Sequence, residues 1–128
     1  METAALRGLS PLTLAFVGDV VYELLAREHI VAGGNCPVKK LNAKKVELVC
    51  CQAQAKAFEQ LWPQLTEEER DVALRGRNAH VGHVPKNATV EEYHGATALE
   101  ALFGWLHLKG DSARVRQLFG QIIGRDGA

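Results

Sequence analysis

Two carboxylates interrupt the most apolar segments of the chain and are its strongest candidates for chemistry. Asp19 lies within residues 14–22 (LAFVGDVVY), and Glu100 lies within residues 98–106 (ALEALFGWL). An unpaired buried carboxylate is costly, so each acid needs an arginine, a hydrogen-bond donor, a proton or a metal ion as its partner. The pattern therefore marks both residues as candidates for a functional site.

The surroundings of the two acids leave two explanations open. If both segments are helical, residues three or four apart share a face, and no basic residue lies one turn from either acid. Small residues lie beside them instead, at Ala15, Ala96 and Gly104. Two such carboxylates suit a hard divalent ion such as Mg²⁺. A buried ion pair with a distant Arg75 or Arg77 explains the acids as well.

Composition bounds the class of protein. The chain has 128 residues, 47% of them hydrophobic, with 15 Lys plus Arg against 15 Asp plus Glu. These values indicate one folded domain rather than a disordered chain. No uncharged stretch approaches the roughly 18–20 apolar residues of a membrane span, and residues 1–5 (METAA) lack the basic start of a secretion signal. The zero net charge, taken alone, argues against nucleic-acid binding.

The cysteines and histidines give weak signals for a metal. Cys36, Cys50 and Cys51 are an odd set without C-x-x-C spacing, and adjacent cysteines point in different directions on a helix. His80 and His83 resemble half of a metal site, but no cysteine pair accompanies them. We therefore expect reduced thiols in a cytosolic protein and no structural zinc.

Helical signals dominate the chain, and strand alternation is absent beyond three or four residues. Ser10 and Pro11 form an N-cap followed by a first-turn proline. Capping boxes begin at Thr66 and Thr89. The sequence thus predicts an all-α fold, with a single domain over residues 1–128 and a core from about residue 9 to 123. Helices are expected over residues 12–31, 36–62, 66–76, 89–108 and 112–123.

One long irregular stretch, residues 76–88, separates the third and fourth of these helices. It contains Arg77, His80, His83 and Lys86, with Gly82 and Pro85 as helix breakers. Long loops in compact domains are often functional, although a solvated connection is an equal alternative.

Together these segments resemble the catalytic domain of the ribonuclease III family. Residues 16–23 (FVGDVVYE) are similar to the signature helix of the family, whose aspartate follows an apolar-apolar-glycine triplet. Residues 98–106 match the second acidic helix of the family. Residues 75–79 (RGRNA) and 85–88 (PKNA) resemble its short Mini form. The resemblance extends over about residues 9–108.

The resemblance implies an all-helical homodimer that hydrolyses double-stranded RNA with Mg²⁺ and leaves a 5′ phosphate. Asp19 and Glu100 match the metal-linked carboxylates of the family. Full-length members have two further acids, where this chain has Ala15 and Thr97, so the number of metal ions stays open. Glu23 is a further candidate ligand, but a solvated acid or one paired with Arg27 is the favoured reading.

The resemblance also bears on RNA binding. Full-length enzymes carry a separate RNA-binding module, for which the twenty residues after Leu108 are too few. We therefore expect the catalytic dimer to bind RNA itself or with a partner, through phosphates and 2′-hydroxyls. The candidate contacts are Lys39, Lys40, Lys44, Lys45, Arg75, Arg77 and Lys86. A solvated helix face is the alternative for the lysines, and internal carboxylate pairing for the arginines.

The leading hypothesis is a Mg²⁺-dependent endoribonuclease that matures the precursor of large-subunit (23S) ribosomal RNA. A ribosomal protein is a candidate partner, and the cytoplasm is the expected compartment, with an organellar form as the alternative. The rival is a catalytically inactive member of the fold that binds RNA or the ribosome, which Ala15 and Thr97 favour. Retention of Asp19 and Glu100 against their burial cost favours the enzyme. A helical protein–protein adaptor, with both acids in internal ion pairs, is the third reading.

Overall fold

The structure is a computed structural model that describes residues 1–79 and 83–126. These residues form α-helices, one 3-10 helix (η1) and no strand, so the predicted all-α class is confirmed. The elements are α1 (Thr3–Arg7), α2 (Pro11–Ala32), α3 (Val38–Val49), α4 (Cys51–Leu61), η1 (Trp62–Gln64), α5 (Glu67–Arg77), α6 (Val90–Lys109) and α7 (Ser112–Asp126). No helix in these ranges is long and apolar enough to cross a membrane.

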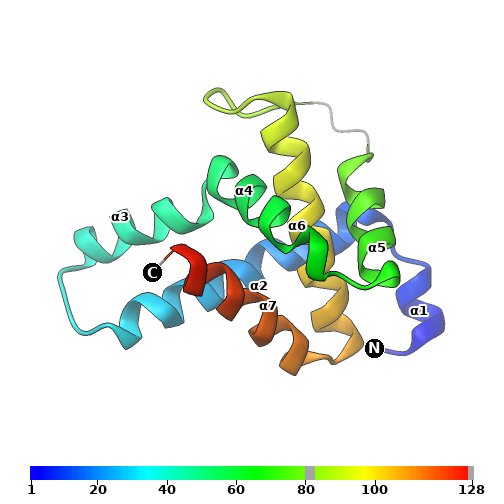
Figure 1. Cartoon of the computed structure of the whole chain (residues 1–128), viewed down its shortest axis with the longest axis horizontal. Coiled ribbons are helices and arrows are strands. Elements are labelled where there is room, and N and C mark those ends of the chain that lie inside the picture. The colour runs from blue at the N-terminus through cyan, green and yellow to red at the C-terminus, as the bar shows by residue number, and fades with distance from the viewer. Residues whose placement is uncertain (80–82, 127–128) are drawn as a thin grey trace.

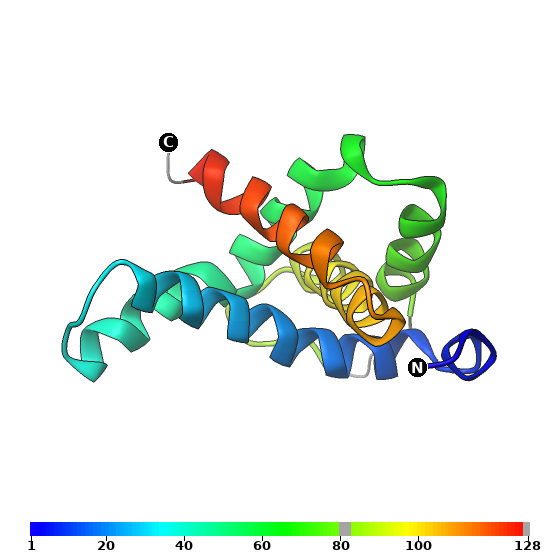
Figure 2. The ribbon, with the colours of Figure 1, turned by 90° about the horizontal axis from the view of Figure 1, so that it is seen from below.

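Helix α6 is the centre of the molecule, with α2, α4 and α5 packed around it (Figure 1). Its middle is enclosed on all sides, and Leu99, Leu102 and Phe103 have no exposed surface. Tyr22 of α2 packs edge-on against Phe103 and against Phe119 of α7, with ring centroids 5.2 and 5.4 Å apart. Figure 2 shows that α2 runs along one side of the molecule, so only part of its surface joins this core.

Glycines let α2 and α6 cross with their backbones in contact. A Cβ atom added at Gly18 would lie 1.6 Å from the carbonyl oxygen of Glu100. One added at Gly104 would lie 1.9 Å from the carbonyl oxygen of Leu14. No other residue type fits at either position, because real side chains do not approach backbone this closely. This crossing sets the relative position of the two acidic helices.

The ends of the helices follow the predicted capping signals. The hydroxyl of Ser10 accepts a hydrogen bond from the backbone N–H of Thr13 at the start of α2. Reciprocal capping boxes begin α5 at Thr66 and α6 at Thr89. Gly110 ends α6 with φ at 92°, a left-handed conformation that favours glycine.

The predicted single helix over residues 36–62 is wrong. It breaks at Cys50, whose backbone is extended (φ −65°, ψ 159°), into α3 and α4. The two halves have different environments: α4 packs on α6, whereas α3 follows the far end of α2 and has no buried residue. Helix α1 was also not predicted, because five residues are too short to show a helical period.

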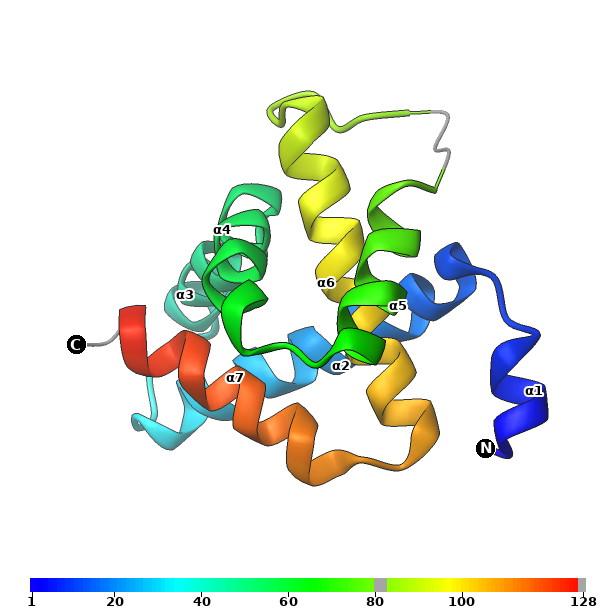
Figure 3. The ribbon, with the colours of Figure 1, turned by 45° about the vertical axis from the view of Figure 1, so that its right-hand side comes forward.

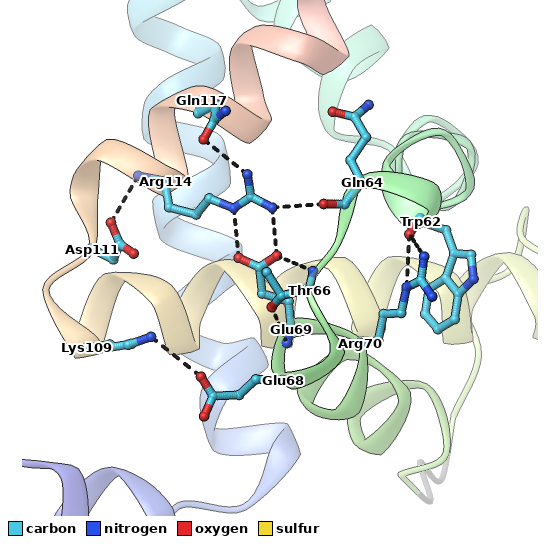
Figure 4. A network of polar contacts seen from close by, with 10 residues as sticks. All are labelled: Trp62, Gln64, Thr66, Glu68, Glu69, Arg70, Lys109, Asp111, Arg114 and Gln117. Carbon is cyan, nitrogen blue, oxygen red and sulfur yellow. Dashed lines mark hydrogen bonds and ion pairs between the residues drawn. The ribbon is translucent and has the colours of Figure 1, made fainter.

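Figure 4 shows a buried ion pair that fastens α7 to α5. Arg114 donates to both carboxylate oxygens of Glu69, at 2.8 and 2.7 Å, and to the carbonyl oxygen of Gln64 at 3.1 Å. The side chain of Glu69 also belongs to the capping box of α5. Helix α7 is therefore held by a bidentate ion pair as well as by the packing of its apolar face.

Candidate active site

The structure brings Asp19 and Glu100 together. Because Gly18 lies against the backbone of Glu100, the next residue of α2 reaches the Glu100 carboxyl group. The two carboxyl groups are within hydrogen-bonding distance of each other. Burial of Glu100, together with the nearby charge of Asp19, raises the pKa of Glu100 to about 8. Two acids held this closely oppose each other's ionisation.

The expected burial of Asp19 is wrong, because this side chain is exposed, whereas Glu100 is largely enclosed. The error comes from the apolar residues of α2, which do not all face the core. Phe16 is 78% exposed and Val20 is 66% exposed. With Leu12 and Leu24 they form an outward row at four-residue spacing, which we call the α2 stripe. Asp19 lies at the edge of this row.

The ion-pair explanation for the two acids does not hold. Neither Asp19 nor Glu100 makes an ion pair within residues 1–79 and 83–126. Glu23, by contrast, pairs with Arg27 at 2.9 Å and with Lys45 at 3.7 Å, as the favoured reading expected. The site therefore consists of two carboxylates without an internal cation.

The positions of the two missing acids add no ligand. Ala15 is buried against the core. Thr97 is buried as well, and its hydroxyl donates to the carbonyl oxygen of Tyr93 on its own helix, at 2.9 Å. Across the described part of the chain, no three Asp, Glu, His or Cys side chains are grouped closely enough to hold a metal ion.

The donor set nevertheless fits Mg²⁺. This ion keeps several waters and binds proteins through one or two carboxylates, together with phosphate oxygens of a substrate. Asp19 and Glu100 supply two oxygen donors side by side, with one of them open to solvent and hence to a substrate. Their mutual repulsion is what a divalent cation between them would relieve.

Sequence reasoning missed a third member of the site, Gln54. It is 2% exposed, and its side chain lies at the Glu100 carboxyl group, where it partly offsets the rise in the pKa of Glu100. A signal was present, because Gln54 occupies one position of the apolar row of α4, which continues through Ala57, Phe58 and Leu61. A polar residue at a core position of an amphipathic helix requires a buried partner.

The cysteines and histidines form no second site in the described part of the chain. All three cysteines are free thiols, as expected. Burial and the nearby charge of Glu100 raise the pKa of the Cys51 thiol, which places Cys51 close to the carboxylate pair. Of the two histidines considered for zinc, His83 is exposed and His80 lies outside the described residues.

Two groups of candidate RNA contacts lie toward opposite ends of the molecule (Figure 1). Lys39, Lys40 and Lys44 are exposed on α3, whereas Lys45 is partly buried and paired with Glu23. Arg75 and Arg77 are exposed at the end of α5 and make no ion pair in the described part of the chain. These groups are thus available to an external anion.

Lys86 belongs to the connection between α5 and α6, part of which is drawn at the top of Figure 3. Lys86 is exposed, and the next residue is tied down, because the side chain of Gln52 donates to the carbonyl oxygen of Asn87 at 2.5 Å. The capping box at Thr89 fixes the same segment to the start of α6. This part of the predicted loop is therefore anchored to α4 and α6.

Comparison with known proteins decides the family. A family model described as the ribonuclease III domain matches residues 12–111, which include both acidic helices. The chain belongs to the ribonuclease III family. Membership makes it an endoribonuclease, and its similarity to Mini-ribonuclease III proteins confirms the resemblance to the short form.

Its relatives match it over most of their length. A Mini-ribonuclease 3 from a Thermoanaerobacter species is 44% identical over 86% of this chain and 78% of its own. A Mini-ribonuclease 3 from Symbiobacterium thermophilum is 42% identical over 86% of this chain and 85% of its own. A crystal structure of a Fusobacterium nucleatum protein superposes with a TM-score of 0.86 at 29% identity, covering 94% of this chain and 96% of that one.

Proposed function

We propose that this chain is a Mg²⁺-dependent endonuclease of double-stranded RNA, with residues 1–128 acting as a single catalytic domain. The observation that carries the proposal is the pairing of Asp19 with Glu100 at the crossing of α2 and α6, with no internal cation among the described residues. Natural sequences seldom keep two such carboxylates together unless the site uses their charge. Family membership supplies the substrate class.

In this proposal the two acids divide the work. Glu100, enclosed by α4 and α6, is the fixed ligand, and Asp19, open to solvent, is the ligand on the side where RNA approaches. Asp19 and Glu100 would hold a Mg²⁺ ion, which would supply polarisation of the scissile phosphate, activation of a water and stabilisation of the leaving 3′ oxygen. The product then carries a 5′ phosphate. The absence of ligand oxygens at Ala15 and Thr97 leaves the remaining metal positions to water and to RNA.

Substitution of each acid by its amide tests the proposal. Asp19→Asn and Glu100→Gln keep the shape of the side chains, and each should abolish cleavage of a double-stranded RNA while circular dichroism stays native. Glu91→Gln is the matched control, because Glu91 is exposed at the first turn of the same helix as Glu100. Near-normal cleavage by either amide variant would remove the carboxylate pair from the catalytic site.

We propose further that RNA lies across the two cationic groups, α3 with Lys39, Lys40, Lys44 and Lys45, and the α5 end with Arg75, Arg77 and Lys86. A-form RNA is bound mainly through its backbone, and the exposure of most of these cations supports such contacts. Lys45 is the weakest member of the set, because it already pairs with Glu23.

The proposed assembly is a homodimer formed through the α2 stripe. Large apolar side chains this exposed are unfavourable on a free surface. Figure 2 shows that α2 runs along one side of the molecule, where no other helix covers its outer side. Because Asp19 borders the stripe, a second copy would lie next to each catalytic site.

The proposed substrate is the precursor of large-subunit ribosomal RNA in a bacterial cytoplasm, with a ribosomal protein as a candidate partner. The support is the similarity to Mini-ribonuclease 3 proteins of bacteria. Incubation of the purified protein with precursor RNA, free or bound to ribosomal proteins, tests substrate and partner together. A single cut near one end of the mature RNA is expected, and random fragmentation would contradict this substrate.

A catalytically inactive RNA-binding module is the second candidate. The presence of Ala15 and Thr97, where full-length relatives in the family have acids, favours it. Neither position presents a ligand oxygen to the carboxylate pair. The same incubation with and without Mg²⁺ separates the two functions. Binding without Mg²⁺-dependent cleavage would establish the module instead of the enzyme.

A further inference from the structure

Gln54 is a buried amide whose position the fold does not explain by packing alone. The other buried residues of α4 are Ala57, Phe58 and Leu61, all apolar. An apolar residue of similar size would fill this position without the loss of about 1–3 kcal/mol that a buried amide incurs when it lacks a hydrogen bond. The amide is retained at 2% exposure, and its partner is the Glu100 carboxyl group.

Close packing of α4 on α6 brings the amide to this carboxyl group. A Cβ atom added at Gly95 would lie 3.1 Å from the Cβ atom of Ala55, so the two helices approach closely there. Gln54 is the neighbour of Ala55, and Glu100 lies one to two turns beyond Gly95 on α6. The donor therefore comes from a helix that carries neither acid, and it contacts Glu100 from the enclosed side of the site.

The chemistry of the donor matters as much as its position. An arginine or lysine at this position would neutralise Glu100 and compete with a cation for its charge. An amide N–H donates one hydrogen bond, fixes the rotation of the carboxyl group and leaves its charge available. This site has two carboxylates rather than four. The affinity for a metal ion therefore depends more strongly on the orientation of each ligand oxygen.

We propose that Gln54 is a positioning residue that orients the Glu100 carboxylate toward the metal ion it shares with Asp19. The inference rests on the proposed function, in which Glu100 is a metal ligand. Outer-shell hydrogen bonds of this kind typically affect metal affinity by about 10–100-fold when they are removed. Gln54 itself touches neither the metal ion nor the RNA.

The test replaces the amide by an apolar side chain of similar length and measures metal binding without turnover. Gln54→Met should weaken Mn²⁺ binding, measured by electron paramagnetic resonance on RNA-free protein, by about tenfold or more. Cleavage should then require more Mg²⁺, with kcat recovering at saturating Mg²⁺ and the KM for RNA unchanged. A structural role alone would lower stability without moving the Mn²⁺ affinity.

Gln60→Met is the matched control, because Gln60 lies on the same helix about 9 Å further along its axis. Gln54→Asn is the second variant, with an amide that is one methylene too short to reach Glu100. It should weaken Mn²⁺ binding as well, and it keeps the test decisive if the Met variant does not fold. Wild-type Mn²⁺ affinity in a folded Gln54 variant would overturn the inference.

Glu100→Gln separates this inference from the function on which it rests. If Glu100→Gln loses Mn²⁺ binding and the Gln54 variants keep it, only the role of Gln54 fails. If Glu100→Gln binds Mn²⁺ as the wild type does, the proposed metal site fails and the role of Gln54 fails with it. Loss of Mn²⁺ affinity in both sets, with Gln60→Met unaffected, supports both proposals.

Discussion

The surroundings of Glu100 oppose the ionisation of its carboxyl group. It is largely enclosed, and the carboxyl group of Asp19 is its immediate neighbour, so its pKa rises from 4.5 to about 8. Between these two values the metal-free folded chain keeps a proton that the unfolded chain releases. Stability therefore falls as the pH rises through this window. A cation at the site would reverse the effect by stabilising the ionised pair.

The raised pKa of Glu100 predicts that the Glu100→Gln variant is more stable than the wild type in the absence of metal. The variant should be close to the wild type at pH 5 and exceed it at pH 8 by on the order of 3–4 kcal/mol, because the raised pKa of Glu100 spans most of this interval and one pKa unit corresponds to about 1.4 kcal/mol. Thermal unfolding in EDTA at both pH values measures the difference. Added Mg²⁺ should then raise the melting temperature of the wild type but not that of the variant. An equal melting temperature at pH 8 without metal would contradict the strained carboxyl pair.

The sequence makes the two acids predictable because they violate a local rule, a charge within an apolar run. It does not reveal Gln54 as their neighbour. The polar residue in the apolar row of α4 indicates that a buried partner is needed, but not which residue on a separate helix supplies it. It also cannot show that Asp19 is exposed. An apolar row has the same pattern whether it faces a core or a partner.

At the scale of elements, the contact between Gly18 and the backbone of Glu100 determines the site. Gly18→Ala would place a methyl group 1.6 Å from a carbonyl oxygen, so the helices must separate. We expect a loss of about 3 kcal/mol or more of unfolding free energy, at the upper end of overpacking effects, with loss of cleavage. Urea unfolding and an RNA cleavage assay measure both effects.

Gly120→Ala is the control for this substitution. Gly120 lies within α7, and an added Cβ atom would meet nothing within 4 Å. Alanine there should be neutral or stabilise the protein by roughly 0.5–1 kcal/mol, because it favours the helix. If both variants lost similar stability, the close crossing of α2 and α6 would not be what fixes the site.

The ion pair between α5 and α7 makes a separate prediction. Burial opposes the ionisation of Glu69, but hydrogen bonds from Arg114 and Thr66 outweigh it and lower the pKa of Glu69. Its contribution is therefore present above pH 4.5 and is lost as the pH falls through the lower folded value. Arg114→Met should cost on the order of 3 kcal/mol at pH 7, because it leaves a buried carboxylate unpaired.

Urea unfolding of Arg114→Met at several pH values checks this prediction. Arg116→Met is the control, since Arg116 is exposed and lies 3.8 Å from Glu28, a geometry worth less than about 1 kcal/mol. The deficit of Arg114→Met should shrink as the pH falls through the lowered pKa of Glu69, because the carboxylate is then protonated. A deficit that did not change with pH would attribute the effect to packing instead of the ion pair.

The start of a helix could be predicted where a side chain caps that helix by a hydrogen bond to its backbone. The capping boxes at Thr66 and Thr89 are of this kind, and both helices begin where expected. The break at Cys50 has no such local cause. It follows from tertiary packing, because α4 lies on α6 while α3 turns away along α2.

At the scale of the whole molecule, zero net charge conceals an uneven distribution. The cations of α3 and of the α5 end are exposed, whereas Glu69 and Glu23 are engaged in ion pairs. Lys40→Glu with Lys44→Glu should weaken RNA binding and flatten its salt dependence, by about one unit of log–log slope for each phosphate that the protein no longer neutralises. Arg7→Glu with Arg116→Glu is the control, with the same change in net charge elsewhere. Equal salt slopes in the two double variants would remove α3 from the RNA-binding surface.

The α2 stripe predicts the assembly of the molecule. Phe16 is the most exposed member, and its ring would be among the first groups buried between two copies related by a two-fold axis. Phe16→Glu should shift the mass measured by light scattering from two chains to one. Cleavage should fall with it, because Asp19 lies one turn along α2. Val90→Glu, at a valine that is 57% exposed outside the stripe, should leave both mass and cleavage unchanged. A wild-type protein of single-chain mass, or a Phe16→Glu variant that stays dimeric, would show that the stripe serves another contact.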